Sequence, residues 1–146
     1  MHDKEIQYFT EGLHLAMDDF YLDAIHKFNM LVDEFPQSDL ADDALYNVGL
    51  CYFKLKQFEQ AKEIFNLVII NYPEATITAL ENGNEFGLIS AKCFLGIFNC
   101  HFIEDNMDNA KEIIETLKTF DQNSYLVLNG KKTTFKEIAT TTLNTK

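Results

Sequence analysis

The 146-residue sequence contains no arginine and no tryptophan, and it has only two prolines and six glycines. Few prolines and glycines favour long helices over many short strands, because both residues mark turns and end regular elements. All twelve basic residues are lysines, against 23 acidic residues, and the net charge is −11. Nucleic-acid binding is therefore not expected, since contacts to phosphates require clustered cations.

The cysteines are few, and no stretch of the chain is long and apolar. Cys51, Cys93 and Cys100 are odd in number and form no Cys-x-x-Cys pair, which favours buried thiols in a reducing compartment. No run approaches the about 20 apolar residues of a membrane-spanning helix. The start, MHDKEIQYF, lacks the apolar core of a secretory signal. We therefore expect a cytoplasmic protein, with a periplasmic location as the alternative if a signal peptide has been removed.

The hydrophobic fraction is 47%, which excludes a disordered chain and is sufficient for one folded domain over residues 1–146. The negative charge is concentrated at one end. Residues 1–50 carry a net charge of −9, whereas residues 51–100 and 101–146 carry −1 each. This imbalance favours a basic partner for the N-terminal third of the chain.

A pattern of small and bulky residues recurs with a period of 37 residues. One copy consists of Gly49, Tyr52, Phe58, Ala61, Phe65, Val68 and Pro73. The copy 37 residues earlier consists of Gly12, Leu15, Tyr21, Ala24, Phe28, Leu31 and Pro36. A third, less regular copy has Gly96, Asn99, Ala110, Ile114 and Leu117. It lacks the proline, and its glycine and alanine are 14 rather than 12 residues apart, which predicts a turn longer by two residues.

The glycines of this pattern lie inside apolar runs that read as helices. A glycine in a helix interior costs about 1 kcal/mol relative to alanine, so a compensating close contact is expected there. Small residues allow two antiparallel helices to approach closely, with a bulky side chain inserted opposite. A period of this length predicts helix pairs that bury their apolar faces by stacking on one another.

The segments "YNVGLCY", "FEQAKEIF" and "NYP" resemble the tetratricopeptide repeat, and "TEGLHLA", "LDAIHKF" and "EFP" repeat the resemblance. The longer connection in "PQSDLADDALYNVG" is similar to the variant found in bacterial envelope-assembly and Tol-Pal-associated proteins. The resemblance implies an all-α fold, a right-handed superhelical stack of three helix hairpins over residues 3–36, 39–73 and 86–121. A C-terminal capping segment over residues 124–144 completes the expected fold.

The expected helices cover residues 3–17, 20–35, 39–55, 58–72, 86–102 and 107–120. In the tail, Asn129-Gly130 between two β-prone runs predicts a hairpin. Thr134 and Glu137 have capping-box spacing and predict a short helix, with Phe135, Ile138 and Leu143 covering the third repeat. The sequence leaves open whether residues 122–146 form a hairpin, a helix or a segment that occupies the groove.

Two groups of residues suggest chemistry, and both are better explained without it. The acidic clusters lack the spacing of a calcium loop, and we expect them to be solvated at turns and helix starts; they are Asp18-Asp19, Asp33-Glu34, Asp39 with Asp42 and Asp43, and Glu104-Asp105 with Asp108. Cys93, Cys100 and His101 lack the further ligands of a zinc site. We therefore predict no catalytic residues, no metal, no cofactor and no enzymatic activity.

The resemblance implies that the first helix of each pair lines a concave groove. Counted from each glycine, the implied partner-binding residues are Phe9, Leu13, Met17, Asp43, Tyr46, Leu50, Phe53, Lys54, Ser90, Ile97 and His101, with Ile6 and Cys93 on the same faces. The alternative for each is packing against the neighbouring helix. Asn47 and Lys54 match two members of the family's carboxylate clamp, but the absence of arginine argues against such a clamp.

The implied function is that of a non-catalytic interaction module. Its groove would bind an apolar or amphipathic segment of another protein or peptide, with no nucleic acid and no membrane insertion. The acidic N-terminal third favours a basic segment. The alternative is a structural subunit or a self-associating component of a larger assembly, and hence a homo-oligomer.

Overall fold

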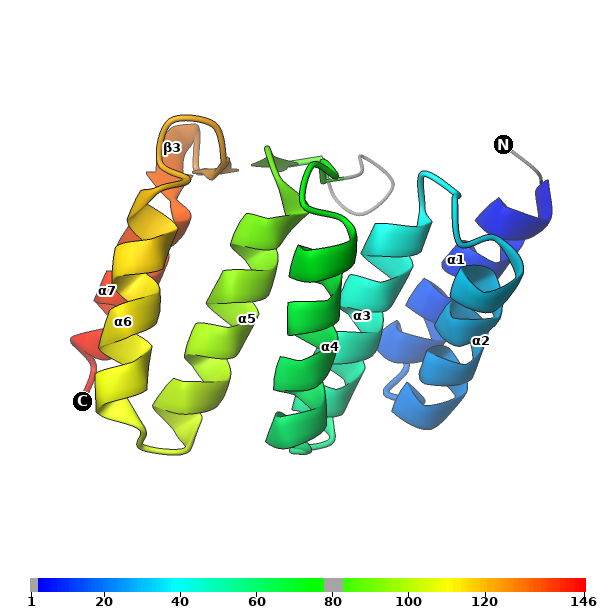
Figure 1. Cartoon of the computed structure of the whole chain (residues 1–146), viewed down its shortest axis with the longest axis horizontal. Coiled ribbons are helices and arrows are strands. Elements are labelled where there is room, and N and C mark those ends of the chain that lie inside the picture. Colours follow the sequence, from blue (N-terminus) through cyan, green and yellow to red (C-terminus); the bar gives the residue numbers. More distant parts are fainter. Residues whose placement is uncertain (1–2, 78–82) are drawn as a thin grey trace. The chain divides into compact units, whose positions relative to one another are not determined.

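The computed structural model describes residues 3–77 and 83–146, and these residues form two compact units that divide after Val68. The first unit contains α1 (Asp3–Met17), α2 (Tyr21–Glu34), α3 (Ala41–Lys54) and most of α4 (Phe58–Asn71). Figure 1 shows α1 with α2, and α3 with α4, as antiparallel helix hairpins. The helices predicted for this part of the chain are therefore present, with ends that differ by up to two residues.

The two repeat glycines of the first unit make the same contact. A Cβ atom on Gly12 would lie 2.5 Å from the ring of Phe28, and one on Gly49 would lie 2.6 Å from the ring of Phe65. Both phenylalanines are fully buried. Gly12 and Gly49 thus occupy the points where α1 meets α2 and where α3 meets α4, as the repeat pattern predicts.

Gly49→Ala is expected to lower the free energy of unfolding by about 1–2 kcal/mol, although alanine is the better helix former by about 1 kcal/mol. The loss arises because the new methyl group would lie 2.6 Å from the ring of Phe65, and this fully buried ring must shift to accommodate it. Urea denaturation followed by circular dichroism measures the change. In a Phe65→Leu background the same substitution should be neutral or stabilising, and an equal loss in both backgrounds would contradict the contact.

The first helix of each hairpin ends in the same backbone turn. Asp19, Lys56 and Asp105 have left-handed φ angles of 65°, 61° and 58°. In each turn the amide of the following residue donates to the carbonyl five positions earlier. Phe20 donates to Leu15 at 2.8 Å, Gln57 to Tyr52 at 2.9 Å and Asn106 to His101 at 2.8 Å. This is the Schellman geometry of helix C-termini.

This turn corrects the expectation for the third repeat. The left-handed residue precedes the repeat alanine by five positions in every copy, as between Asp105 and Ala110. The turn itself therefore has the same length in all three hairpins. The two extra residues lie between Gly96 and the turn, in the longer C-terminal part of α5 (Ile89–Ile103).

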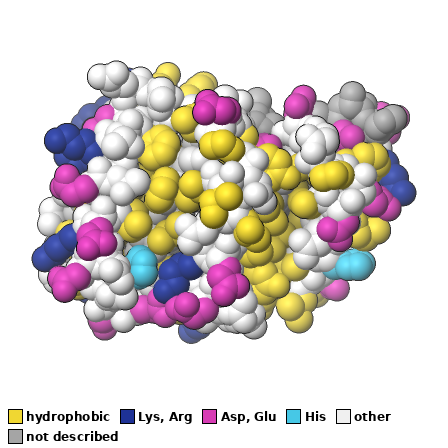
Figure 2. Space-filling view, viewed as in Figure 1, with side chains coloured by type: hydrophobic (Ala, Val, Ile, Leu, Met, Phe, Trp, Pro, Cys, Tyr) yellow, Lys and Arg dark blue, Asp and Glu magenta, His cyan; other side chains and the backbone are white. Residues whose placement is uncertain are grey.

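The second unit contains α5, α6 (Met107–Lys118) and α7 (Phe135–Leu143), with strands β1 (Glu85–Phe86), β2 (Tyr125–Leu128) and β3 (Lys131–Thr134). Figure 1 shows α5 and α6 as an antiparallel hairpin with α7 against it, and charged side chains cover α6 in Figure 2. The core of this unit consists of Ala91 and Phe98 from α5, Ala110, Ile114 and Leu117 from α6, and Phe135 and Ala139 from α7.

The tail forms both elements that its sequence suggested. Thr134 accepts a hydrogen bond from the Glu137 amide at 3.1 Å and caps α7. The core-facing side of α7 repeats every fourth residue, with Phe135, Ala139 and Leu143. Ala139 therefore occupies the core position predicted for Ile138, and Ile138 is half-buried.

A three-stranded antiparallel sheet in the order β1-β2-β3 modifies the all-α expectation, although the described chain remains mostly helical. Residues 85–86 pair with β2, so the third repeat begins its helix at Ile89 rather than at Phe86. Phe86 stacks on Tyr125 with ring centroids 5.4 Å apart. The exposed Lys131 and Lys132 on the edge strand disfavour pairing with further strands.

Candidate functional site

The first unit contains a hollow of about 210 Å³ between its first and third helices. Its lining residues are Leu13, Ala16 and Met17 of α1, Tyr21 of α2, and Asn47, Leu50, Cys51 and Lys54 of α3. Leu13 and Leu50 are equivalent residues of the two repeats, 37 positions apart. The repeat therefore places the same apolar side chain on two walls of one hollow.

The polar groups of this hollow are few and mostly oriented by the protein. Asn47 Nδ2 donates to the carbonyl of Asp43 at 2.8 Å, and the Tyr21 hydroxyl donates to Asp19 Oδ1 at 2.8 Å. Burial raises the pKa of the Cys51 thiol to about 11, so this thiol is uncharged at neutral pH and is a poor nucleophile. The exposed Lys54 is the only charged group among the lining residues. The site is suited to apolar contact rather than to covalent chemistry.

The structure separates the predicted groove residues into three groups. Four of them line the hollow, namely Leu13, Met17, Leu50 and Lys54. Phe53 and His101 are partly exposed. Five are buried, namely Phe9, Asp43, Tyr46, Ser90 and Ile97.

The buried aromatic residues of this set contact the core phenylalanines. The ring centroids of Phe9 and Phe28 are 6.0 Å apart, and those of Tyr46 and Phe65 are 5.7 Å apart. Tyr21 and Ala16 line the hollow but were not identified from the sequence. Tyr21 belongs to a second helix of a pair, and the prediction considered only first helices. Its position directly after the α1–α2 turn is the signal that identifies it.

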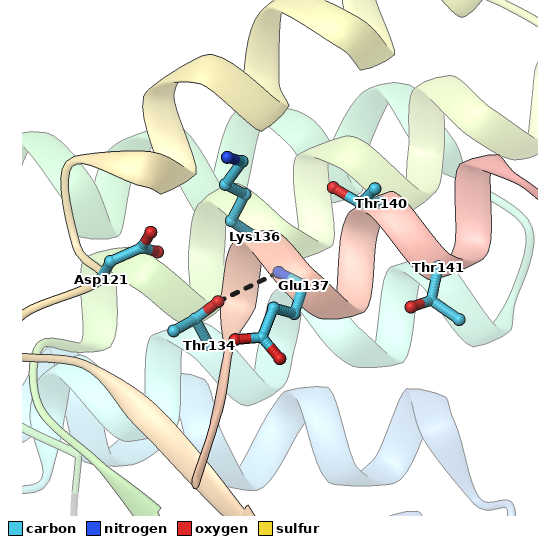
Figure 3. Close-up of a pocket in the computed structure, with 6 residues that line it drawn as sticks. All are labelled: Asp121, Thr134, Lys136, Glu137, Thr140 and Thr141. Carbon is cyan, nitrogen blue, oxygen red and sulfur yellow. Dashed lines mark hydrogen bonds between the residues drawn. The ribbon is translucent and has the colours of Figure 1, made fainter.

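The second unit has a wider, more polar hollow of about 430 Å³ around the start of α7. It is lined by Asp121, Thr134, Lys136, Glu137, Thr140 and Thr141. Figure 3 shows five of these side chains on α7 and its cap, with Asp121 on the segment that follows α6. Asp121 Oδ1 is buried and accepts no hydrogen bond within the described structure. The sequence indicates Thr134 and Glu137 only as a helix cap, by their capping-box spacing.

The start of α3 corrects the expectation that all the acidic clusters are solvated. Asp42 is 4% exposed and Asp43 is fully buried, whereas the other cluster members are exposed. Burial raises the pKa of Asp42 to about 6, and hydrogen bonds from the first-turn amides of Asp42 and Asp43 oppose this rise. A carboxyl group with this pKa binds a proton more readily in the folded chain than in the unfolded one.

Asp42→Asn is expected to change how stability depends on pH. In the parent, the folded state binds more protons than the unfolded state between about pH 4 and about pH 6, so stability falls as pH rises through that window. The asparagine variant should lose this decline and be more stable than the parent above about pH 6. Urea denaturation at several pH values measures the difference. The exposed Asp33→Asn control should keep the parent's dependence, and parallel curves for Asp42→Asn and the parent would contradict the prediction.

Cys51, Cys93 and Cys100 are free and buried, which confirms the prediction of core thiols. No group of three His, Cys, Asp or Glu side chains among residues 3–77 and 83–146 is arranged to hold a metal ion. No helix in these two ranges is long and apolar enough to cross a bilayer.

Comparisons with known proteins support the fold. Residues 43–75 match the tetratricopeptide repeat family model. No curated protein matches the sequence. The Sgt2 TPR domain from Aspergillus fumigatus is similar with a TM-score of 0.66 at 18% identity, over 99% of this chain and 80% of that one.

Two further structures are similar at the level of fold. The second TPR domain of human RPAP3, solved in complex with the HSP70 peptide SGPTIEEVD, has a TM-score of 0.65 at 15% identity, over 97% of this chain and 93% of that one. The CopN–Scc3 complex contains a chain with a TM-score of 0.64 at 14% identity, over 97% of this chain and 68% of that one. None of these comparisons supports the Tol-Pal-associated subtype. The chain has the tetratricopeptide-repeat fold, with one repeat matched directly over residues 43–75.

Proposed function

We propose that this chain is a non-catalytic interaction module that binds an apolar or amphipathic segment of another protein in the hollow lined by α1 and α3. The observation that carries the proposal is the pair of equivalent leucines, Leu13 and Leu50, on the walls of that hollow, with Met17 beside them. An apolar side chain of a partner entering the hollow would be removed from water, at about 25 cal/mol per Å² of apolar surface buried.

The charge of the first unit favours a basic segment. Residues 1–68 contain thirteen acidic residues and five lysines, a net charge of −8. The RPAP3 domain is bound to a peptide that ends in the acidic sequence EEVD. The present chain has no arginine to receive such a terminus, and its acidic surface would repel it. We therefore propose a partner segment in which lysine or arginine flanks the apolar residues.

Selection of peptides from a random displayed library against the full chain tests this proposal. The selected peptides should combine apolar residues with lysine or arginine. Leu50→Asn should weaken their binding at least about tenfold, which corresponds to about 1.4 kcal/mol. Leu67→Asn is the matched control, because Leu67 is exposed on α4 and lines neither hollow of the first unit.

Equal binding by the parent and Leu50→Asn would overturn the hollow as the binding site. Selection of acidic peptides would overturn the proposed chemistry of the partner. A molar mass that increases with concentration in light scattering, together with failure to select any peptide, would favour the alternative of a self-associating structural subunit.

A further inference from the structure

Three large apolar side chains are exposed around the turn that joins α1 and α2. Met17, Phe20 and Leu22 are 78%, 57% and 69% exposed. Phe20 and Leu22 border a second hollow of about 330 Å³, which is also lined by Asp19, Tyr21, Asp23 and Leu55. We call Met17, Phe20 and Leu22, together with the neighbouring carboxylates of Asp18, Asp19 and Asp23, the turn patch.

The second repeat provides an internal comparison for the turn patch. The left-handed residues Asp19 and Lys56 align the two turns residue by residue. In this alignment Met17, Phe20 and Leu22 correspond to Lys54, Gln57 and Glu59, all of which are polar and exposed. The turn therefore forms equally well with polar residues at these positions, and folding does not explain the apolar ones.

The third repeat leads to the same conclusion for two of the three positions. Asp105 is the left-handed residue there, so Asn106 and Asp108 correspond to Phe20 and Leu22. Both residues are exposed. Among the three turns, exposed aromatic and leucine side chains at these positions are thus specific to the first. Contiguous exposed apolar side chains are typical of surfaces that bind another molecule.

The charge around the turn patch indicates the chemistry of that molecule. Asp18, Asp19 and Asp23 are exposed, and none of them forms an ion pair with a lysine of the described chain. A basic segment would pair with these carboxylates while its apolar side chains cover Phe20 and Leu22. A second copy of this chain fits less well, because a symmetric contact would bring the two acidic rims together.

We propose that the turn patch is a second docking surface, and that its occupant is a basic segment of a partner protein with interspersed apolar side chains. The turn patch shares Met17 with the hollow of the proposed function, and the second hollow shares Tyr21 with it. Neither the turn patch nor the second hollow includes Leu13 or Leu50. One partner segment that runs along the acidic first unit can contact both sites, or two segments can bind separately.

The test uses the full chain and a fluorescent peptide of about 14 residues with leucine and lysine at helical spacing. Fluorescence anisotropy measures its binding. The double variant Phe20→Gln and Leu22→Glu introduces the residues that the second repeat has at the same positions, so the turn is expected to fold unchanged. We expect this variant to bind at least about tenfold more weakly than the parent.

A second variant tests the charge without changing the apolar surface. Asp19→Asn with Asp23→Asn keeps the size of both side chains, and asparagine tolerates the left-handed backbone of position 19. Binding should weaken about threefold or more, and the parent's affinity should fall between about 50 mM and about 300 mM salt, because exposed charges are screened. The matched peptide with glutamate in place of lysine should not bind.

The matched control is Leu67→Asn, which changes an exposed leucine that lines neither hollow and should leave peptide binding intact. Leu50→Asn is measured beside it to separate the two sites. If Leu50→Asn loses peptide binding and the Phe20/Leu22 variant does not, the turn patch is not the docking surface, while the proposed function stands. If only the Phe20/Leu22 variant loses peptide binding, the result supports the turn patch and not the other hollow. Absence of binding by the parent, equal binding of the glutamate peptide, or a dimer of the parent that the Phe20/Leu22 variant abolishes would each overturn the proposal.

Discussion

Phe28→Ala is expected to lower the free energy of unfolding by about 3–5 kcal/mol, the usual loss when a fully buried phenylalanine is truncated. Phe28 is completely buried, lies against Gly12, and meets the ring of Phe9 edge-on at 6.0 Å. Because Gly12 has no side chain, it cannot contribute atoms to fill the cavity that the truncation leaves. Urea denaturation followed by circular dichroism measures the loss.

Phe20→Ala is the matched control, since it removes the same side chain eight residues earlier in the chain. Phe20 is 57% exposed, so its loss should change stability by no more than about 0.5 kcal/mol. Similar losses for the two variants would show that the ring of Phe28 does not organise the hairpin of α1 and α2. A small effect of Phe20→Ala would also show that this side chain of the turn patch is not needed for folding.

The helix hairpins of this fold were predictable because their signals are local and repeated. Gly49 and Phe65 appear again as Gly12 and Phe28, so two separate segments predict the same contact. A glycine inside an apolar helical run is an unusual choice, and a nearby large partner explains it. The structure confirms both contacts.

Which side of each helix faces the core was less predictable. Phe9 and Tyr46 were assigned to a groove by counting from the glycines, yet both contact core phenylalanines. A helical repeat fixes the angle between residues but not which neighbours cover each face. The burial of Asp42 and Asp43 was not predictable either, because charged residues at a helix start are ordinarily solvated. Which neighbours cover them is not marked in the local sequence.

The strand at Glu85–Phe86 was not predictable from its own sequence. Its two residues pair with β2, whose residues are 39 to 41 positions further along the chain. Such a short strand exists only through its partner, so no local periodicity marks it. The part of the insertion at residues 78–82 lies outside the described residues.

Gly87→Ala is expected to lower the free energy of unfolding of the second unit by about 2–4 kcal/mol, the combined effect of backbone strain and overpacking. Gly87 has a φ angle of 107°, where residues with a side chain are strained. A Cβ atom there would also collide with the carbonyl of Asn123 and with the backbone and hydroxyl of Ser124. Backbone atoms cannot rotate away as a flexible side chain can, so the segment itself must shift.

Hydrogen exchange of individual amides can locate the effect of Gly87→Ala. The amide of Ile77 donates to the Gly87 carbonyl at 2.8 Å, and the amide of Leu88 donates to Ser124 Oγ at 3.0 Å. In hydrogen-exchange NMR these two amides should lose protection in Gly87→Ala.

Gly83→Ala is the control, because Gly83 also has a positive φ angle, 75°, but has nothing within 4 Å of an added Cβ. It should cost only about 1 kcal/mol and leave both amides protected, since strain acts there without a collision. Equal effects of the two substitutions would show that the contact with Asn123 and Ser124 does not hold the start of α5 in place.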